Sequence, residues 1–216
     1  MGQQTSPRPR LARRAREQQM LEVAHPLFAQ RGFQAVTMDD VATQAGVTKP
    51  LLYAYFGNKD SLYIACMEPA GDAMLAAVCG AVGEAENPAD ALRYGLHAFF
   101  AFVEQDRDAW RVLFDETLPA GGEIARRVGE YRERLTRIIA DSQLALVPAR
   151  HRARAATDTE ALATALLGAC EAMARWWLRT GAMSSEAAAE LLSSTVEPGL
   201  LSLSERSAGS SAGARA

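Results

Sequence analysis

The chain has 216 residues, of which 49% are hydrophobic and 23% are charged, and its formal net charge is −3. This length can bury a sizeable core and suits one small domain followed by a larger one. We expect a cytoplasmic protein without a membrane partner, because no apolar run approaches the roughly 18 residues of a span. The N-terminus has arginines but no compact apolar region of the secretory kind.

The cysteines and histidines give no sign of a metal centre or a cofactor. Cys66, Cys79 and Cys170 are odd in number, have no CxxC spacing and lie in apolar surroundings, which favours inert thiols over a redox switch. The three histidines are scattered and form no ligand pair. We therefore predict neither a metal site nor a cofactor.

Positive charge is concentrated near the N-terminus. Up to Asp60 there are eight Lys and Arg residues against five acids, or +3, which leaves −6 for the remainder of a chain that totals −3. We predict a flexible basic arm over residues 1–15, kept extended by Pro7 and Pro9, in which Arg10, Arg13 and Arg14 reach phosphates or a narrow minor groove. A solvated tail without contacts is the alternative.

The segment 37–62, TMDDVATQAGVTKPLLYAYFGNKDSL, predicts two short helices joined by a tight turn and the start of a third. Thr37 and Asp40 have the spacing of a capping box, so a helix begins near Met38. Gly46 suits the left-handed residue that ends this helix. Thr48 is the next N-cap, and Pro50 is tolerated in the first turn. We expect the second helix over 49–56 and a third from about Lys59.

The second of these helices has two different faces. At about 100° per residue, Leu52 and Phe56 share a core face. Pro50, Leu51 and Ala54 point the opposite way, and this apolar strip lies beside tyrosines and lysines. Such a strip suits a major groove, where apolar groups meet thymine methyls. A buried helical hairpin is the alternative, but the caps, turn and basic residues together favour a helix-turn-helix at about 37–56 that binds double-stranded DNA.

These residues resemble the TetR family of transcriptional regulators. The matching stretches are LFAQRGF (27–33), TMDDVATQAGVTK (37–49) and LYAYFGNKDSL (52–62). The resemblance implies that Lys49, Pro50 and Tyr53 approach base edges, and that Thr37, Thr48, Tyr55 and Lys59 hold phosphates. Two residues depart from the family pattern. Leu51 stands where many members have a small hydroxyl residue, and Pro26 predicts a kink or irregular turn in the first helix.

The rest of the chain predicts helices throughout, so the expected fold is all-α. A three-helix DNA-binding domain (16–62) precedes a larger helical effector-binding and dimerisation domain (63–203) and a disordered tail (204–216). The helices expected in the larger domain cover about 59–82, 89–105, 107–118, 122–146, 159–180 and 185–203.

Two surfaces of the larger domain are assigned to partners. The last two helices carry more apolar surface than one face can hide, so we predict a homodimer through Leu166, Cys170, Leu191, Leu192 and Val196, where the resemblance also places its dimer contact. An ordinary monomer core is the alternative. The resemblance further implies a pocket for a small apolar or aromatic effector. Its candidate residues are Met74, Phe99, Phe102, Trp110, Phe114, Met173 and Trp177.

The function expected from these features is a DNA-binding transcriptional regulator. In this reading a repressor binds a palindromic operator as a homodimer and is released by an effector. A nonspecific architectural DNA-binding protein is the first alternative. An all-α enzyme is the second, but no nucleophile, base and orienting group are clustered in sequence and no glycine-rich phosphate loop is present.

Overall fold

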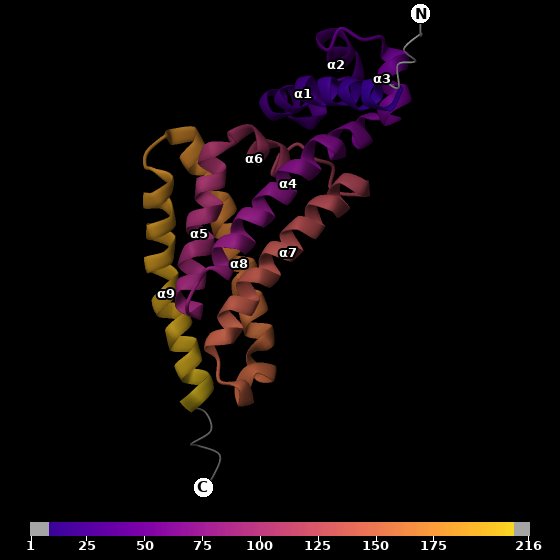
Figure 1. Cartoon of the computed structure of the whole chain (residues 1–216). Coiled ribbons are helices and arrows are strands. Elements are labelled where there is room, and N and C mark those ends of the chain that lie inside the picture. The colour runs from indigo at the N-terminus through magenta and orange to yellow at the C-terminus, as the bar shows by residue number, and fades with distance from the viewer. Residues whose placement is uncertain (1–8, 210–216) are drawn as a thin grey trace, which may run out of the picture. The chain divides into compact units, whose positions relative to one another are not determined.

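The computed structural model describes residues 9–209, except for the side chains of a few of them, and its regular structure is helical throughout that range (Figure 1). The helices are α1 (Pro9–Ala35), α2 (Met38–Gln44), α3 (Lys49–Phe56), α4 (Lys59–Gly83), α5 (Pro88–Gln105), α6 (Arg107–Leu113), α7 (Gly122–Leu146), the short 3₁₀ turn η1 (Ala149–His151), α8 (Arg152–Thr180) and α9 (Ser185–Gly209). The all-α fold predicted from the sequence is confirmed.

The chain folds as two compact units. The first contains the chain up to Ala70 together with Arg111–Arg127, and the second contains Gly71–Trp110 and the chain from Val128 onward. The sequence predicts a boundary near residue 62, whereas the first unit extends to Ala70 and includes the later segment Arg111–Arg127. Burial explains this grouping, because Val112, Leu113, Phe114 and Ile124 all lie in hydrophobic contact rather than in a solvated loop.

The first unit is built around a cluster of aromatic rings. Tyr63 packs edge-on against Phe28 and Phe33, with ring centroids 4.9 Å and 5.1 Å apart. The Tyr63 hydroxyl is buried and donates a 2.5 Å hydrogen bond to the Val112 carbonyl, so the ring satisfies its polar atom without reaching water. Burial raises the pKa of Tyr63 far above its ordinary value. This contact holds the 111–127 segment to the helices of the first unit.

The α1 helix corrects two expectations. It begins at Pro9, so Arg13 and Arg14 lie on a helix rather than on an extended arm, because proline suits a first helical position and Arg and Ala favour a helix. Pro26 lies inside α1, and the non-helical residue is instead Gly32, with φ 76° and ψ 162°. Residues 1–8 lie outside the described range, as does the 210–216 part of the predicted tail.

Gly32 allows the end of α1 to bind the 111–127 segment. The Phe33 amide donates to Asp115 Oδ2 at 2.6 Å, and the Gln34 amide donates to Thr117 Oγ1 at 3.4 Å. A Cβ added at Gly32 would lie 2.9 Å from Thr117 Oγ1, closer than real Cβ atoms approach a neighbour. Both the backbone conformation and the close approach therefore require glycine here.

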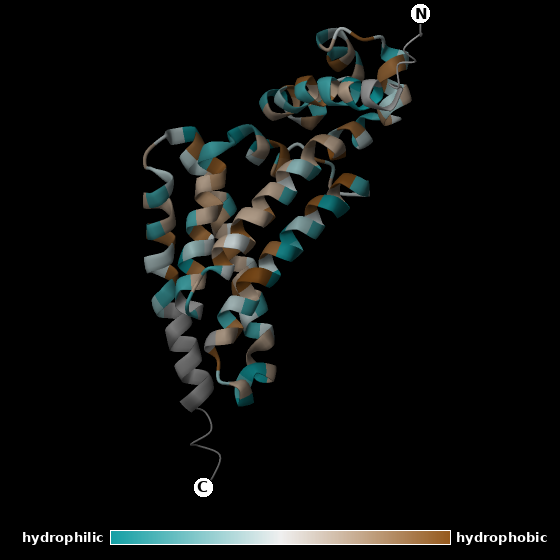
Figure 2. Ribbon diagram, in the orientation of Figure 1, coloured by the Kyte–Doolittle hydropathy of each residue, from teal (hydrophilic) through white to brown (hydrophobic). Residues whose placement is uncertain are grey.

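The second unit packs its helices around aromatic and aliphatic side chains. The α5 and α9 helices lie along one another, and α8 contacts both (Figure 1). Phe99 packs edge-on against Phe100 and Trp110, and Phe100 in turn packs against Trp177. The Trp177 indole donates to the Met183 carbonyl at 2.6 Å, which fixes the turn between α8 and α9. Figure 2 shows hydrophobic and hydrophilic residues mixed along the coloured parts of these ribbons.

The last two helices are longer than predicted. The α8 helix begins at Arg152, because residues 152–158 continue the helix that the apolar stripe alone predicted from Thr159. The Ser184 hydroxyl accepts from the Ala187 amide at 3.1 Å and so caps the start of α9. The α9 helix continues to Gly209, whereas the sequence predicted disorder from residue 204.

The α4 helix is apolar enough to resemble a membrane span. Among the described residues it is the one helix whose length and composition would suffice to cross a membrane, and half of its most apolar window is buried inside the protein. The sequence predicts no uninterrupted apolar run here, because Glu68 and Asp72 lie within the apolar part of α4. Burial within the protein explains that character equally well.

We predict that Gly32→Ala destabilises the protein, by about 1 to 3 kcal/mol or more, because its φ and ψ are reserved for glycine. Urea denaturation followed by circular dichroism measures the change. Gly129→Ala is the matched control, since a Cβ there meets nothing within 4 Å. This exposed position in α7 should gain about 0.5 to 1 kcal/mol. Equal urea midpoints for Gly32→Ala and the wild type would contradict the conclusion that Gly32 is required by its backbone conformation.

Candidate functional site

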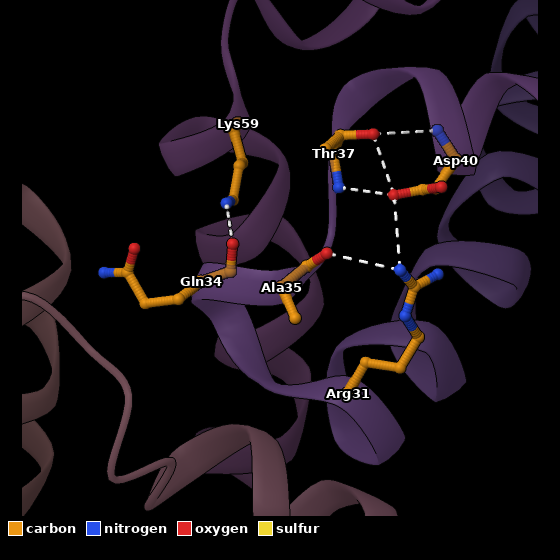
Figure 3. A network of polar contacts seen from close by, with 6 residues as sticks. All are labelled: Arg31, Gln34, Ala35, Thr37, Asp40 and Lys59. Carbon is orange, nitrogen blue, oxygen red and sulfur yellow. Dashed lines mark hydrogen bonds and ion pairs between the residues drawn. The ribbon is translucent and has the colours of Figure 1, made fainter.

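The start of α2 is fixed by the capping box that the sequence predicted. The Thr37 hydroxyl accepts from the Asp40 amide at 3.1 Å, and Asp40 Oδ2 accepts from the Thr37 amide at 2.9 Å and from its hydroxyl at 2.8 Å. The Arg31 guanidinium lies 3.6 Å from the same carboxylate and donates to the Ala35 carbonyl (Figure 3). These hydrogen bonds to Thr37, with the nearby Arg31 charge, lower the pKa of Asp40.

The turn between α2 and α3 also follows the prediction. Gly46 has φ 64°, and a Cβ there would meet nothing within 4 Å, so its backbone conformation alone explains the glycine. The Val47 amide then donates to the Ala42 carbonyl at 3.0 Å, and the Leu51 amide donates to Thr48 Oγ1 at 3.4 Å. The two short helices are thereby joined at a fixed angle.

The α3 helix has one buried face and one exposed face. Leu52 is fully buried and Phe56 is 9% exposed, so both belong to the core as predicted. Leu51 and Tyr53 are among the exposed large hydrophobic residues of the described chain, at 36% and 41%, and Pro50 and Ala54 are exposed with them. The outward apolar strip is therefore present on the folded protein.

The polar residues around this strip already have partners within the protein. The Lys49 ammonium lies 2.7 Å from Asp39 Oδ2, which raises the pKa of Lys49. The Lys59 ammonium donates to the Gln34 carbonyl at 3.4 Å (Figure 3). It also lies 4.3 Å from the centroid of the Phe33 ring. Partial burial lowers the pKa of Lys59. The sequence analysis did not identify Asp39 as a site residue. Its position in the first turn of α2, close to the start of α3, was the signal that could have indicated it.

One basic residue of α1, Arg13, contacts the α3 helix. The Arg13 guanidinium carbon lies 5.1 Å from the centroid of the Tyr55 ring, within the range of a cation–π contact. This contact brings together two residues that the sequence assigned separately to the arm and to phosphate binding. Arg14 is exposed on α1, and the side chain of Arg10 lies outside what the structure describes.

A second candidate site is an apolar cavity within the second unit. Its volume is about 40 Å³. Its wall is formed by four helices, through Val78, Val82, Ala91, Leu92, Gly95, Leu96, Phe99, Leu135, Ile138, Ile139, Ser142, Leu166, Leu167 and Cys170. One polar side chain, the Ser142 hydroxyl, lines it, and this hydroxyl donates to the Ile138 carbonyl at 2.9 Å.

Most of the predicted effector residues do not line this cavity. Of the seven, Phe99 alone lies in its wall. Met74, Trp110, Phe114 and Trp177 are buried, whereas Phe102 and Met173 are half-buried. The prediction favoured aromatic rings, but the rings of Phe99, Trp110 and Trp177 pack against other rings as core. Aliphatic residues line the space that remains.

The sequence predicts three buried, inert thiols, and this is confirmed for the burial of Cys66 and Cys170 but wrong for Cys79. Burial raises the pKa of the Cys66 and Cys170 thiols to about 12, so both are protonated near neutral pH. Cys79 is an exposed free thiol. Within the described part of the chain, no cluster of three or more His, Cys, Asp or Glu side chains is placed to hold a metal ion.

The predicted dimer residues divide into two groups. Leu166, Cys170 and Leu192 are buried within their own chain, so they belong to its core and cannot form an outer surface. Leu191 is 48% exposed and Val196 is half-buried. The exposed face of α8 instead carries Ala165, Gly168, Ala172 and Trp176, on the opposite side from the buried stripe. The α8 stripe that the sequence assigned to a partner is therefore part of the core, and contact through α8 and α9 stays a prediction.

Comparison with known protein families shows which family this chain belongs to. Residues 20–66 match the family described as bacterial regulatory proteins of the tetR family. Residues 88–197, about half of the chain, match the tetracyclin repressor-like C-terminal domain. The chain belongs to the TetR family. It is thus a DNA-binding transcriptional regulator and not an enzyme.

Individual relatives agree over most of the chain. The HTH-type transcriptional activator FasR of Mycolicibacterium smegmatis is 31% identical over 169 residues, covering 78% of this chain and 75% of FasR. A TetR-like regulator from Rhodococcus sp. RHA1 shares the fold with a TM-score of 0.72 and 34% identity, covering 86% of this chain and 96% of that one.

A more distant structure shows the fold alone. AibR, solved in complex with isovaleryl coenzyme A and operator DNA, has a TM-score of 0.64 and 20% identity, and the match covers 85% of this chain and 98% of AibR.

Proposed function

We propose that this regulator binds a palindromic operator as a homodimer, with α3 in the major groove, and that a small apolar effector controls its release. The observation that carries the proposal is the α3 helix itself. Its core face is sealed by Leu52, while Pro50, Leu51, Tyr53 and Ala54 form an exposed strip that nothing in the described chain covers. An exposed apolar strip of this kind marks an interaction surface.

The chemistry of the strip suggests how bases are read. Pro50, Leu51 and Ala54 have no side-chain hydrogen-bonding group, so they are suited to thymine methyls. Hydrogen bonds to the base edges are therefore assigned to Thr48, Lys49 and Tyr53. The Thr48 hydroxyl accepts from the Leu51 amide and keeps its proton to donate. Thr37 differs, because its hydroxyl donates to Asp40, so its contribution to phosphate binding is the position of α2.

The direction of regulation depends on the operator. The relative named above is an activator, whereas the matching C-terminal family is repressor-like in its description. One DNA-binding mode serves both outcomes, since a protein bound over a promoter blocks transcription and one bound beside it can recruit polymerase. With an operator that overlaps its promoter, the protein acts as the repressor expected from the sequence.

We predict that Tyr53→Ala lowers affinity for an operator selected from a random DNA pool by about 1 to 3 kcal/mol and relaxes preference at one position. Lys59→Ala should instead weaken binding to all DNA sequences alike. It should also reduce the slope of log affinity against log salt concentration by about one. Fluorescence anisotropy titrations at several salt concentrations measure both effects. Gln30→Ala, at an exposed position of α1, is the control and should bind as the wild type does.

Unchanged affinity in both Tyr53→Ala and Lys59→Ala would overturn the recognition-helix assignment. Binding that depends strongly on salt but prefers no sequence would favour the nonspecific architectural protein instead.

The homodimer is proposed through the outer faces of α8 and α9. One recognition helix reads too few bases to specify a site, so two half-sites one helical turn apart require two copies. Among the described side chains of these helices, Leu191 and Trp176 are the exposed large hydrophobic ones, and small residues on α8 allow a second helix to approach closely. The buried Leu166, Cys170 and Leu192 support this face from within.

We predict that Leu191→Glu produces monomers and abolishes operator binding, because the new charge would be buried without a partner. Sedimentation velocity at micromolar concentration distinguishes the two states. Ala145→Glu introduces the same charge at an exposed position of α7 and should remain a dimer. If the Leu191→Glu variant remains a dimer, the proposal that this face forms the dimer interface is wrong.

The effector is proposed to carry a short aliphatic acyl group. The cavity wall is almost wholly aliphatic, and its 40 Å³ is room for about three water molecules. One residue beyond Ser142 on α7, the Gln143 side chain is 4% exposed, and both its amide atoms lack a hydrogen-bond partner in the described structure. Gln143 does not line the cavity, so the polar group that its wall offers to a ligand is the Ser142 hydroxyl, which can still accept a hydrogen bond. The isovaleryl coenzyme A bound by AibR is a ligand of this kind.

We predict that isovaleryl coenzyme A binds the protein and lowers its operator affinity several-fold to a hundredfold, whereas free coenzyme A does not. Isothermal titration calorimetry and anisotropy measure the two effects. Ala91→Leu narrows the cavity and should abolish the response, and Ala76→Leu, at an exposed position of α4, should keep it. Equal binding by wild type and Ala91→Leu would place the ligand elsewhere.

A further inference from the structure

A carboxylate lies at the edge of the surface assigned to DNA, although the phosphates of DNA repel negative charge. Asp39 lies in the first turn of α2, and its Oδ2 is 2.7 Å from the ammonium of Lys49, the first residue of α3. The two side chains remain 64% and 49% exposed respectively. The pair therefore presents a fixed acceptor and a fixed donor to solvent, side by side.

The pair is not needed to build the helix-turn-helix. The α2 helix is already capped by Thr37 and Asp40, and α3 is capped by Thr48. The burial of Val41 and Leu52 fixes the two helices in the core. An exposed ion pair adds little stability. A role in recognition explains better why an acid stands next to the first residue of the recognition helix.

We propose that Asp39 and Lys49 act together as one base-reading unit, which accepts a keto base on the Lys49 side and an amino base on the Asp39 side. This inference rests on the function proposed above, with α3 in the major groove. Guanine O6 and cytosine N4 are hydrogen-bonded to each other within their pair, so they lie about 2.9 Å apart. The ammonium and carboxylate, 2.7 Å apart, match this spacing with complementary chemistry.

The Asp39 carboxylate distinguishes one orientation of the base pair from the reversed one. Lys49 donates to guanine O6, or to thymine O4, while Asp39 accepts from cytosine N4 or adenine N6. If the base pair is reversed, Asp39 faces a carbonyl oxygen and Lys49 faces an amino group, and neither can form a hydrogen bond. Rejection of the reversed pair is therefore built into the unit. Guanine is preferred to thymine, because its N7 offers the ammonium a second acceptor.

The test compares Asp39→Asn with the wild type on the selected operator. Each base pair in turn is reversed, and affinities are measured by fluorescence anisotropy. For the wild type we expect reversal at one position per half-site to lower affinity on the order of tenfold. Asp39→Asn should reduce this loss to about twofold or less, because a carboxamide can either donate or accept.

Asp60→Asn is the matched control for charge. It removes one negative charge from an exposed position in the first turn of α4, away from the α2–α3 pair. It should strengthen binding to all sequences alike and preserve the preference at the reversed position. Circular dichroism of both variants establishes that the fold is intact.

Two results would overturn the inference. The first is that Asp39→Asn behaves as Asp60→Asn does, with uniformly tighter binding and unchanged base preference. Asp39 would then only weaken DNA binding through its negative charge. The wild type could also select an operator in which no reversal matters. If instead the wild type selects no sequence at all, the proposed function fails first, and the inference fails with it.

Discussion

The burial of one face of α3 is the constraint on which the functional surface depends. An eight-residue helix is too short to be stable alone, so α3 exists because Leu52 and Phe56 are packed into the first unit. Once that face is fixed, the opposite face must point outward. The exposure of Pro50, Leu51, Tyr53 and Ala54 is thus a geometric consequence of core packing, and caps at Thr37 and Thr48 set the rotation and start of each helix.

The same unit extends further along the chain than its motif. Gly32, Asp115 and Thr117 connect the end of α1 to a segment more than eighty residues away, and Tyr63 adds a buried hydrogen bond to Val112. Two of these contacts give hydrogen-bond acceptors to the Phe33 and Gln34 amides, which directly follow the interruption of α1 at Gly32. The DNA-binding helices are therefore stabilised by residues that follow α5. The 111–127 segment belongs to their structure as much as α2 does.

The polar residues near α3 share a common property. Lys49, Tyr55 and Lys59 each have a protein partner, namely Asp39, Arg13 and the Phe33 ring with the Gln34 carbonyl. Held side chains lose less conformational freedom on binding than free ones. A surface with pre-oriented donors and an apolar strip suits the reading of sequence more than nonspecific attraction to phosphate, which needs only mobile positive charge.

The sequence alone determined the local features of this protein. The capping box, the turn at Gly46, the bounds of α3 and its two faces all follow from contacts between residues within a few positions of one another, and the motif they form identified the family. The tertiary structure decided what depends on distant contacts. It assigned 111–127 to the first unit, gave the glycine rather than Pro26 the irregular backbone in α1, and placed Leu166 and Leu192 in the core. It also separated aromatic core from aliphatic cavity and brought Asp39 to Lys49. Periodicity shows which residues share a helix face, but only packing shows which neighbour covers that face.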